Sequence, residues 1–554
     1  MALLERRIGL LFAAFLTLLV LAGARTLWLG LINGSSLATA AASQQVTSTD
    51  LPARRGTIVD RKGIELAVSE PADDISATPY LVGDPVKAAA KLAPLLGVPS
   101  DTLVRKLARR DTGFFYLARR VPADTADKVG NLKLPGIQLA PGHLRVYPRE
   151  YLASQLLGSV GTDGTGLSGL EYADDRVLQG TDGKRRLVKD ALGQPIEVRD
   201  TKPARAGARI ELTIDAAIQD KVEQVLADVG QTYQPKGATA IVMNPNTGEI
   251  LALANWPRVD NNKPWAAPAY AYQDRAVGYT YEPGSTFKSV TVAGALQDGT
   301  VTPGTQFNLD PQIHVADRTI GESEVVTGPR TLTTSQILAQ SSNVGAVTVG
   351  LRMGRQRFDY WVRQFGFGKP TGVDLPGEER GIVLPVDKYS GSSMGNLPIG
   401  QGLSVTPIQM AQAYAAIANG GVLRAPYVVR RVDGQVKPAP KGHRIISERT
   451  AAQLRQMLEG AFAPGGTASE VSIRGYRLAG KTGTANKIDP TTGEYSKSRY
   501  IASFMGFAPA LHPKLLIGVM VDEPQGAIYG GVVAAPAFGR IASFALPYLR
   551  IAPQ

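Results

Sequence analysis

The sequence predicts an α+β fold built around an antiparallel five-stranded sheet with helices, together with a mainly helical subdomain. An elongated α/β domain is expected before it, and one transmembrane helix at the N-terminus. Three observations lead to this prediction. An uncharged apolar run occupies residues 8–24, strand-like segments bracket a long helix-rich stretch, and 554 residues are enough for two or three domains with a large core.

Composition narrows the possible functions. Hydrophobic residues make up 44% of the chain, and 60 glycines and 37 prolines suit a loop-rich globular protein. Because there is no cysteine, disulfides, thiolate metal sites and cysteine nucleophiles are excluded. The net charge of +12 comes from scattered basic residues without interleaved aromatics, so we expect no binding of nucleic acid. Four dispersed histidines offer no metal-ligand spacing, and we expect neither a metal nor a cofactor.

Residues 8–32 are predicted to be a transmembrane anchor. As a helix, the uncharged run 8–24 spans about 26 Å, slightly less than the roughly 30 Å of a hydrocarbon core. The apolar residues that follow it supply the remaining length. Arg6 and Arg7 place the short tail, residues 1–7, in the cytoplasm and the rest of the chain outside it.

A cleaved signal peptide is the alternative for this segment. Ala22-Gly23-Ala24 has the small-x-small pattern of a cleavage site directly after the apolar run. An apolar stretch resumes immediately after it, which a mature N-terminus has little reason to carry, so the uncleaved anchor is favoured. Residues 33–50, rich in Ser, Ala, Gln and Thr, are then predicted to be a flexible tether.

Residues 51–204 are predicted to form a domain without a catalytic role. A short strand lies between turn signals in 54–64, and the patterns of 84–107 and 123–132 are helical. No pair of catalytic carboxylates is recognisable here, so glycosyl transfer by this chain is not expected. The simplest interpretation is a spacer.

Two features of this spacer resemble functional sites. The glycine-rich stretch 161–166 lacks the Gly-Lys-Ser/Thr continuation of a phosphate-binding loop, so it is interpreted as a turn. The arginines of the region and Glu171 are interpreted as internal hydrogen-bonding residues, not as catalysts.

Residues 205–554 are predicted to form the catalytic α+β domain. An amphipathic helix follows Asp215, and a second helix closes the chain from about residue 533 to 549. Five strands complete the antiparallel sheet: 238–243 and 249–254 as a hairpin, a strand around Lys481, and strands at 500–507 and 515–521. The intervening segment, 285–470, is mainly helical in pattern.

Ser285 and Lys288 are the candidate catalytic pair. Pro283-Gly284 ends the preceding segment and an apolar helical run follows, so Ser285 lies at the mouth of a helix with Lys288 one turn later. A serine hydroxyl becomes a nucleophile when a neighbouring base takes its proton, and a lysine amine held neutral is such a base.

Two further motifs follow in order along the chain. Ser341-Ser342-Asn343 gives Ser-x-Asn, and Lys481-Thr482-Gly483-Thr484 gives Lys-Thr-Gly. The ordered triple is typical of penicillin-recognising serine enzymes. The chain therefore resembles the class B penicillin-binding proteins, which are monofunctional peptidoglycan D,D-transpeptidases. Residues 281–288 and 399–407 are most similar to the cell-division branch of that family.

The resemblance implies a role for each motif residue. Ser285 forms an acyl-enzyme with a stem peptide, and Lys288 is the general base. Ser341 relays a proton to the leaving amine, and Asn343 holds Lys288 and the substrate amide. Lys481 is the second cation, whose repulsion is expected to lower the pKa of Lys288.

The third motif is expected to bind the substrate. Thr482 and Thr484 offer hydroxyls to its carboxylate, while Gly480 and Gly483 let its backbone lie along the strand. The backbone N–H groups of Ser285 and Thr484 are expected to form the oxyanion hole.

The resemblance also implies partners and a location. Expected partners are peptidoglycan stem peptides, a SEDS-type membrane glycosyltransferase, division proteins, the lipid bilayer and β-lactam inhibitors. The expected location is the cytoplasmic membrane, with the catalytic domain on its extracytoplasmic side at the division septum. The spacer is then a pedestal that lifts the catalytic domain off the membrane.

Alternatives remain from other functional classes. An elongation-type transpeptidase has the same motifs. A β-lactamase, a β-lactam sensor or a catalytically inactive scaffold of the division machinery would share the fold of the penicillin-recognising serine enzymes. A β-lactamase needs a water-activating base that the sequence does not reveal. Residues 391–395 match the Gly-x-Ser-x-Gly nucleophile elbow of α/β-hydrolases, but their flanks are loop-like and the expected strand and helix are missing.

Overall fold

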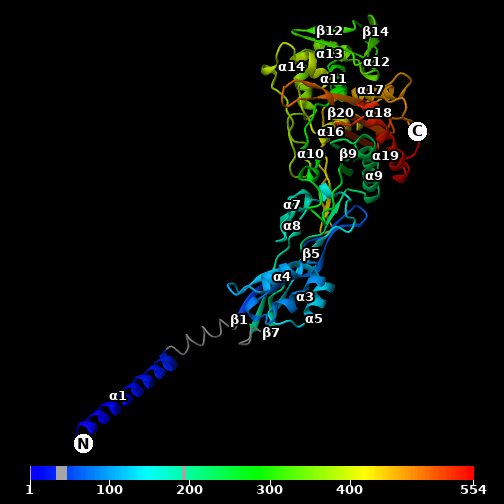
Figure 1. Ribbon diagram of the computed structural model, residues 1–554. Helices are drawn as coiled ribbons and strands as arrows, with labels where there is room; N and C mark the ends of the chain where they lie inside the picture. Colours follow the sequence, from blue (N-terminus) through cyan, green and yellow to red (C-terminus); the bar gives the residue numbers. More distant parts are fainter. Residues whose placement is uncertain (1, 33–45, 190–194, 554) are drawn as a thin grey trace. The chain divides into compact units, whose positions relative to one another are not determined.

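The chain forms two compact units in the computed structural model, which describes residues 2–32, 46–189 and 195–553 (Figure 1). The first unit comprises Met1–Arg54, Pro71–Leu144 and Gly180–Gly207, and the second comprises Arg55–Glu70, Arg145–Gln179 and Ala208–Gln554. Neither unit is a single continuous segment of the chain. Two parts of the predicted spacer therefore belong to the unit that holds all the predicted site residues.

A long apolar helix begins the chain. Helix α1 (Ala2–Leu27) continues into a π-helical turn, Trp28–Ile32, and the segment Arg6–Gly30 is long and apolar enough to cross a membrane. Among the described residues, Gly530–Tyr548 passes the same test, but it is largely buried and is a core helix. Most of the predicted tether, residues 33–45, lies outside the described residues.

The first unit contains a three-stranded antiparallel sheet and a second group of strands covered by helices. The last residues of the predicted tether form β1 (Val46–Leu51) in the first sheet, beside β6 (Gly183–Lys189) and β7 (Pro195–Lys202). In the second group, the end of β3 (Glu65–Ala77) pairs with β4 (Phe115–Pro122) and β5 (Ile137–Val146).

Helices pack on these strands and form the core of the first unit. The predicted helical segment 84–107 is two helices, α3 (Pro85–Leu96) and α4 (Ser100–Leu107), because Gly97 adopts a left-handed φ of 64° and Pro99 follows. Helix α5 (Ala123–Asn131) lies where it was predicted. Leu92, Leu103 and Leu117 are among the buried side chains that these elements share.

The second unit is built on the predicted five-stranded antiparallel sheet. Its strand order is β10-β9-β21-β20-β19, and every neighbouring pair is antiparallel. The strand that carries Lys481 is therefore at one edge. The strands are β9 (Gly237–Met243), β10 (Ile250–Trp256), β19 (Ala479–Ile488), β20 (Tyr495–Ala508) and β21 (Leu515–Asp522).

Helices cover both faces of this sheet. On one face α9 (Ala216–Tyr233), which is capped by Asp215, packs beside α19 (Ala535–Tyr548), and the short α18 (Gly530–Val533) precedes α19 (Figure 1). On the other face α16 (Pro407–Ala418) packs on β21 and β9. Every residue of β21 is buried, which explains its continuous apolar run.

The segment between β10 and β19 is mainly helical, as predicted, with small two-stranded sheets added. The helices are α10 (Arg275–Gly278), α11 (Lys288–Gln297), α12 (Thr334–Ala339), α13 (Asn343–Met353), α14 (Arg355–Gln364), α15 (Ser393–Asn396) and α17 (Glu448–Glu459). The sheets pair β11 (Gln306–Leu309) with β14 (Arg330–Thr333), β12 (Gln312–Val315) with β13 (Arg318–Gly321), and β15 (Val422–Leu423) with β18 (His443–Arg444).

The nucleophile-elbow alternative finds no support in this segment. Ser393 is the first residue of the four-residue helix α15, and the two residues before it form a turn instead of a strand. An elbow requires a strand that leads directly into a helix. Ser393 is therefore not placed as a hydrolase nucleophile.

Short elements from the predicted spacer complete the second unit. A sheet in the order β17-β16-β8-β2 continues to the beginning of β3, and small helices follow β5. Its remaining elements are β2 (Ile58–Val59), β8 (Ile210–Leu212), β16 (Val429–Val432), β17 (Gln435–Val436), α6 (Ser154–Leu157), α7 (Gly169–Ala173) and α8 (Asp175–Leu178).

A buried ionic cluster joins these elements. Both oxygens of the Glu171 carboxylate, which is fully buried, accept hydrogen bonds: one from Arg55 Nε at 2.6 Å and one from Arg145 Nε at 2.7 Å. Arg55 also donates to Asp175 at 2.6 Å. The interpretation of Glu171 and the arginines as internal hydrogen-bonding residues is confirmed. The stretch 161–166 is a turn, closed by the Gly161 N–H donating to Thr165 O at 2.8 Å.

Candidate active site

Ser285 lies in a tight turn that opens directly into a helix. The 3₁₀ turn Gly284–Phe287 precedes α11, and Lys288 is the first residue of that helix. Gly284 has a φ of 53°, a conformation that favours glycine. Ser285 is half-buried, so its hydroxyl is reachable from solvent.

A second segment holds this turn in place. The Gly284 N–H donates to Gly400 O at 3.0 Å, and Tyr281 forms a bridge with Val405. A Cβ at Gly400 would lie 2.2 Å from Gly284 O, so only glycine permits this approach. The two stretches on which the division-branch resemblance rests, 281–288 and 399–407, therefore lie side by side around Ser285.

Lys288 is fully buried and contacts the second motif. Its Nζ donates to Ser341 O at 2.6 Å, to Ser341 Oγ at 3.2 Å and to Asn343 Oδ1 at 2.7 Å. Burial lowers the pKa of Lys288 to about 7, and the nearby carboxylate of Glu322 acts in the opposite direction. A substantial fraction of the amine is therefore neutral at neutral pH, as a general base requires.

The second motif lies at the junction of two helices. Ser341 falls between α12 and α13 with a φ of 61°, a left-handed conformation that is uncommon for serine. Asn343 is the first residue of α13, and its side-chain Nδ2 donates to Gly321 O at 3.0 Å. This bond turns the amide so that its oxygen faces Lys288.

Lys481 brings the third motif to the same place. It is fully buried in β19, and its pKa is lowered well below that of a free lysine, first by burial and then by the charge of Lys288. Burial is the main cause of the lowered pKa of Lys288. The two buried amines also repel each other, so each one disfavours the charged form of the other.

Gly480 and Gly483 pack tightly against the protein's own side chains. A Cβ at Gly483 would lie 2.4 Å from Ser503 Oγ and 2.9 Å from Thr286 Cγ2, and a Cβ at Gly480 would lie 2.6 Å from Phe504 Cζ. The missing side chains thus face the protein's own interior. Glycine at position 483 lets the turn that carries Ser285 pack against the edge strand.

The two threonines of this motif are held by hydrogen bonds. Thr482 Oγ1 donates to Thr467 Oγ1 at 2.8 Å, and Thr484 Oγ1 accepts the Gly530 N–H at 3.1 Å. Because the bond from Gly530 uses only a lone pair of Thr484, the Thr484 hydroxyl retains its proton for a further hydrogen bond.

Family models match most of the chain. Residues 238–543 match the penicillin-binding protein transpeptidase domain, and residues 50–212 match the penicillin-binding protein dimerisation domain. The chain belongs to the class B penicillin-binding proteins. The three motifs that the fold assembles around Ser285 are those of this family.

Related proteins align with this penicillin-binding protein over nearly its full length. The peptidoglycan D,D-transpeptidase FtsI of Escherichia coli K12 is 35% identical, covering 99% of this chain and 92% of FtsI. Stage V sporulation protein D of Bacillus subtilis is 34% identical, and the alignment covers 94% of this chain and 82% of that protein. The crystal structure of penicillin-binding protein 3 from Mycobacterium tuberculosis, complexed with aztreonam, has a TM-score of 0.72 at 31% identity. The match covers 91% of this chain and 98% of that one.

Two residues at the site of this penicillin-binding protein were missed in the sequence. Glu322 lies just after β13 and contacts the second motif, and Thr467 orients Thr482. Both are in loops outside any motif. No local pattern distinguishes them from other polar loop residues.

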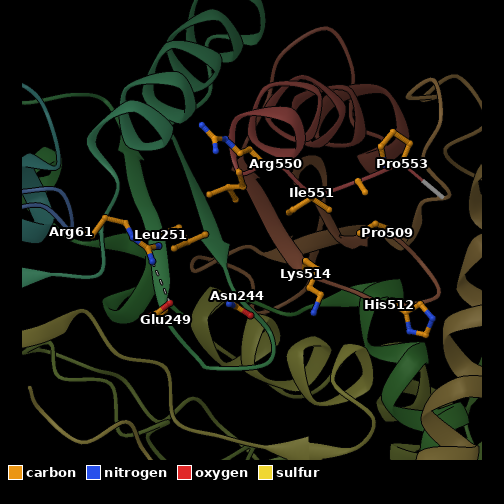
Figure 2. Close-up of a pocket in the computed structure, with 12 residues that line it drawn as sticks. Arg61, Asn244, Glu249, Leu251, Pro509, His512, Lys514, Arg550, Ile551 and Pro553 are labelled. Atoms are coloured by element: carbon orange, nitrogen blue, oxygen red, sulfur yellow. Dashed lines mark ion pairs between the residues drawn. The ribbon is translucent and has the colours of Figure 1, made fainter.

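A separate pocket of about 510 Å³ lies in the second unit (Figure 2). Its lining comes from β10, the turn between β20 and β21, and the C-terminal segment, and includes Lys514 and Arg550. Arg61 and Glu249 form an ion pair across 3.7 Å at its side (Figure 2). None of the predicted site residues lines this pocket.

Proposed function

We propose that this class B penicillin-binding protein is a serine D,D-transpeptidase that cross-links stem peptides of peptidoglycan during septal cell-wall synthesis. One observation carries the proposal: a fully buried Lys288, one turn after Ser285, contacts both Ser341 and Asn343. A neutral amine there has two N–H groups for Ser341 O and Asn343 Oδ1, and its lone pair remains for a proton from the nucleophile.

The first half-reaction forms an acyl-enzyme. Ser285 Oγ attacks the carbonyl carbon of the penultimate D-alanine as Lys288 takes the serine proton. A C–O bond forms, the C–N bond to the terminal D-alanine breaks, and Ser341 passes a proton to the leaving amine. In the second half-reaction the amine of an acceptor stem peptide attacks the ester carbonyl carbon and forms the new C–N bond. The C–O bond to Ser285 breaks, and the proton that the amine loses passes by way of Lys288 to Ser285 Oγ.

The edge strand β19 is the proposed substrate platform. A stem peptide adds to its free edge as a further strand, with the terminal carboxylate near Thr482, Thr484 and Lys481. The backbone N–H groups of Ser285 and Thr484 form the oxyanion hole, in which one donor is worth about 3–4 kcal/mol of transition-state stabilisation. β-Lactams acylate the same serine.

We propose that a single N-terminal transmembrane span anchors the protein in the cytoplasmic membrane. Residues 1–7 are cytoplasmic, 8–32 cross the membrane, and 33–50 tether the pedestal, 51–204, and the transpeptidase domain, 205–554. The apolar helix α1 fits single-pass anchoring. Glycan strands come from a SEDS-type glycosyltransferase partner, and the purified chain polymerises none from lipid-linked precursor.

Labelling with fluorescent penicillin tests the nucleophile. Mass mapping is expected to find one adduct, on Ser285, and Ser285→Ala is expected to lose it completely. Ser393→Ala, which removes the serine of the nucleophile-elbow pattern, is the matched control and is expected to label like the wild type. An adduct retained in Ser285→Ala would reject the proposed chemistry.

Localisation tests the septal role. The resemblance of 281–288 and 399–407 to the division branch, and the match to FtsI, support the septum. A functional fluorescent fusion is expected to concentrate at the division site. An even distribution along the side wall would favour the elongation role instead.

Removal of the anchor tests the membrane assignment. A chain beginning at Ser43, before β1, is expected to be soluble and to bind penicillin, whereas the full chain stays in the membrane fraction. N-terminal sequencing of the mature protein is expected to begin before Ala22. A mature N-terminus at Arg25 would show that the signal-peptide alternative is correct.

A further inference from the structure

We infer that Glu322 is a positioning residue for the catalytic lysine: it fixes the Ser341–Asn343 segment against Lys288 and sets the charge that Lys288 faces. The inference rests on the proposed function of Ser285 and Lys288. It concerns a loop residue that belongs to none of the three motifs.

The Glu322 side chain is almost fully buried, and its carboxylate accepts three hydrogen bonds. Its side chain is 6% exposed, and Oε1 accepts the Ser342 hydroxyl at 2.5 Å and Arg330 Nη2 at 2.8 Å. Its Oε2 accepts the backbone N–H of Asn343 at 2.6 Å. Bonds to an ionised carboxylate are shorter and stronger than neutral ones, so this side chain anchors both residues that follow Ser341.

The adjoining backbone fixes the other end of Asn343. Gly321 O accepts Asn343 Nδ2 at 3.0 Å, which leaves Asn343 Oδ1 to accept from Lys288 Nζ at 2.7 Å. Gly321 thus holds the side-chain amide of Asn343, and Glu322 holds its backbone N–H. Because Ser341 holds an uncommon left-handed conformation between two helices, its place against Lys288 depends on the residues that anchor the segment after it.

Charged groups approach Lys288 from two sides. Lys481 lies on β19, and Glu322 lies after β13 with Arg330 of β14 paired to it. The carboxylate favours the charged form of Lys288, whereas burial disfavours it. Glu322 therefore keeps the catalytic lysine from losing its proton at too low a pH, and Arg330 moderates that effect.

Acylation of the full-length protein by fluorescent penicillin, measured across pH, tests the inference. Glu322→Gln removes the charge at nearly constant size, so the rising limb of the rate is expected to move to lower pH by about one unit. Its plateau is expected to fall, because an amide offers one acceptor where the carboxylate offers two. Arg330→Gln is expected to move the limb in the opposite direction, since Glu322 then acts on Lys288 uncompensated.

Two further variants separate positioning from folding. Glu322→Asp keeps the charge on a shorter side chain. Its acylation rate is expected to rise at the same pH as in the wild type but to reach a lower plateau. Glu324→Gln changes an exposed carboxylate in the same loop and is the matched control, with limb and plateau unchanged. If Glu322→Gln does not fold, Arg330→Gln and Glu322→Asp still show at which pH the acylation rate rises.

The outcomes distinguish this inference from the proposed function. If the wild type acylates Ser285 but the limb stays at the wild-type position in both Glu322→Gln and Arg330→Gln, Glu322 has only a structural role and the inference is rejected. If the wild type is not acylated at Ser285 at any pH, the proposed function itself fails.

Discussion

The second unit contains two buried clusters of charged side chains with opposite chemical consequences. In the Glu171 cluster, the guanidinium groups of Arg55 and Arg145 meet the carboxylates of Glu171 and Asp175. In the Lys288 cluster, two buried amines face one carboxylate, Glu322, which is also paired with Arg330. The first cluster balances its charges and the second carries an excess of positive charge.

This difference in balance separates a structural site from a reactive one. A guanidinium does not lose its proton in proteins, so the Glu171 cluster stays ionised and holds its elements together. A buried amine without a full counter-charge gives up its proton more readily, so Lys288 is poised as a base near neutral pH. Burial alone does not identify a catalytic group, whereas burial with unbalanced charge does.

The largest expected effect comes from fixing the charge on Lys288. Lys288→Arg is expected to lower the second-order acylation rate by about 10²–10⁴-fold, since a guanidinium cannot accept the serine proton. Stopped-flow acylation measures it, with a thermal melt to confirm folding. A rate within tenfold of the wild type would remove Lys288 from the role of base.

Unbalancing the structural cluster is expected to affect stability instead of chemistry. Glu171→Gln leaves two arginines without their shared carboxylate and is expected to lower the free energy of unfolding by about 3–5 kcal/mol. Denaturant unfolding measures the loss, and acylation per folded molecule is expected to stay near wild type.

The control for this change is Glu70→Gln, an exposed carboxylate in the same unit. It is expected to change the free energy of unfolding by less than about 0.5 kcal/mol. A stable Glu171→Gln protein that no longer acylates would contradict the division between the two clusters.

Removing the second amine is expected to have a smaller effect. Lys481→Gln is expected to lower acylation by about tenfold, through a weaker contact with the substrate carboxylate. The pH limb is expected to move to higher pH, because the repulsion between the two buried amines is lost. A limb that stays at its wild-type position would show that repulsion from Lys481 does not lower the pKa of Lys288.

The smallest effect is the pH dependence of the wild type. Lys288 must be neutral to act, so acylation is expected to rise through a midpoint near pH 7, which matches its pKa of about 7. Between pH 7 and pH 6 the rate is expected to fall about fivefold as the amine becomes protonated. A rate independent of pH across this range would mean that a different group is the base.

Several elements were predictable because their signals are local. Four strands of the sheet, β9, β10, β20 and β21, contain apolar segments bounded by turns, and α9 begins at a capping Asp215. The three motifs specify their chemistry through residue type and order. The helical pattern of 84–107 was correct, although the break at Gly97 was not foreseen.

Other features depend on residues far apart in the chain. The placement of 55–70 and 145–179 in the catalytic unit follows from the strand pairing of β2 with β8 and from the Glu171 cluster. Glu322 contacts residues about twenty positions away, and glycine is required at 483 because the nucleophile turn packs against it. None of these contacts leaves a pattern in its own neighbourhood.

The sequence by itself determined the residue types of the site, their order and the strands and helices that carry them, because periodicity, turns and caps act over a few residues. Only the tertiary structure decided that the pKa of both lysines is lowered. The pKa of a buried amine depends on desolvation and on every charge within a few ångströms, and those neighbours come from β13, β14 and β19. The balance between Glu322, Lys288 and Lys481 is a property of the folded chain.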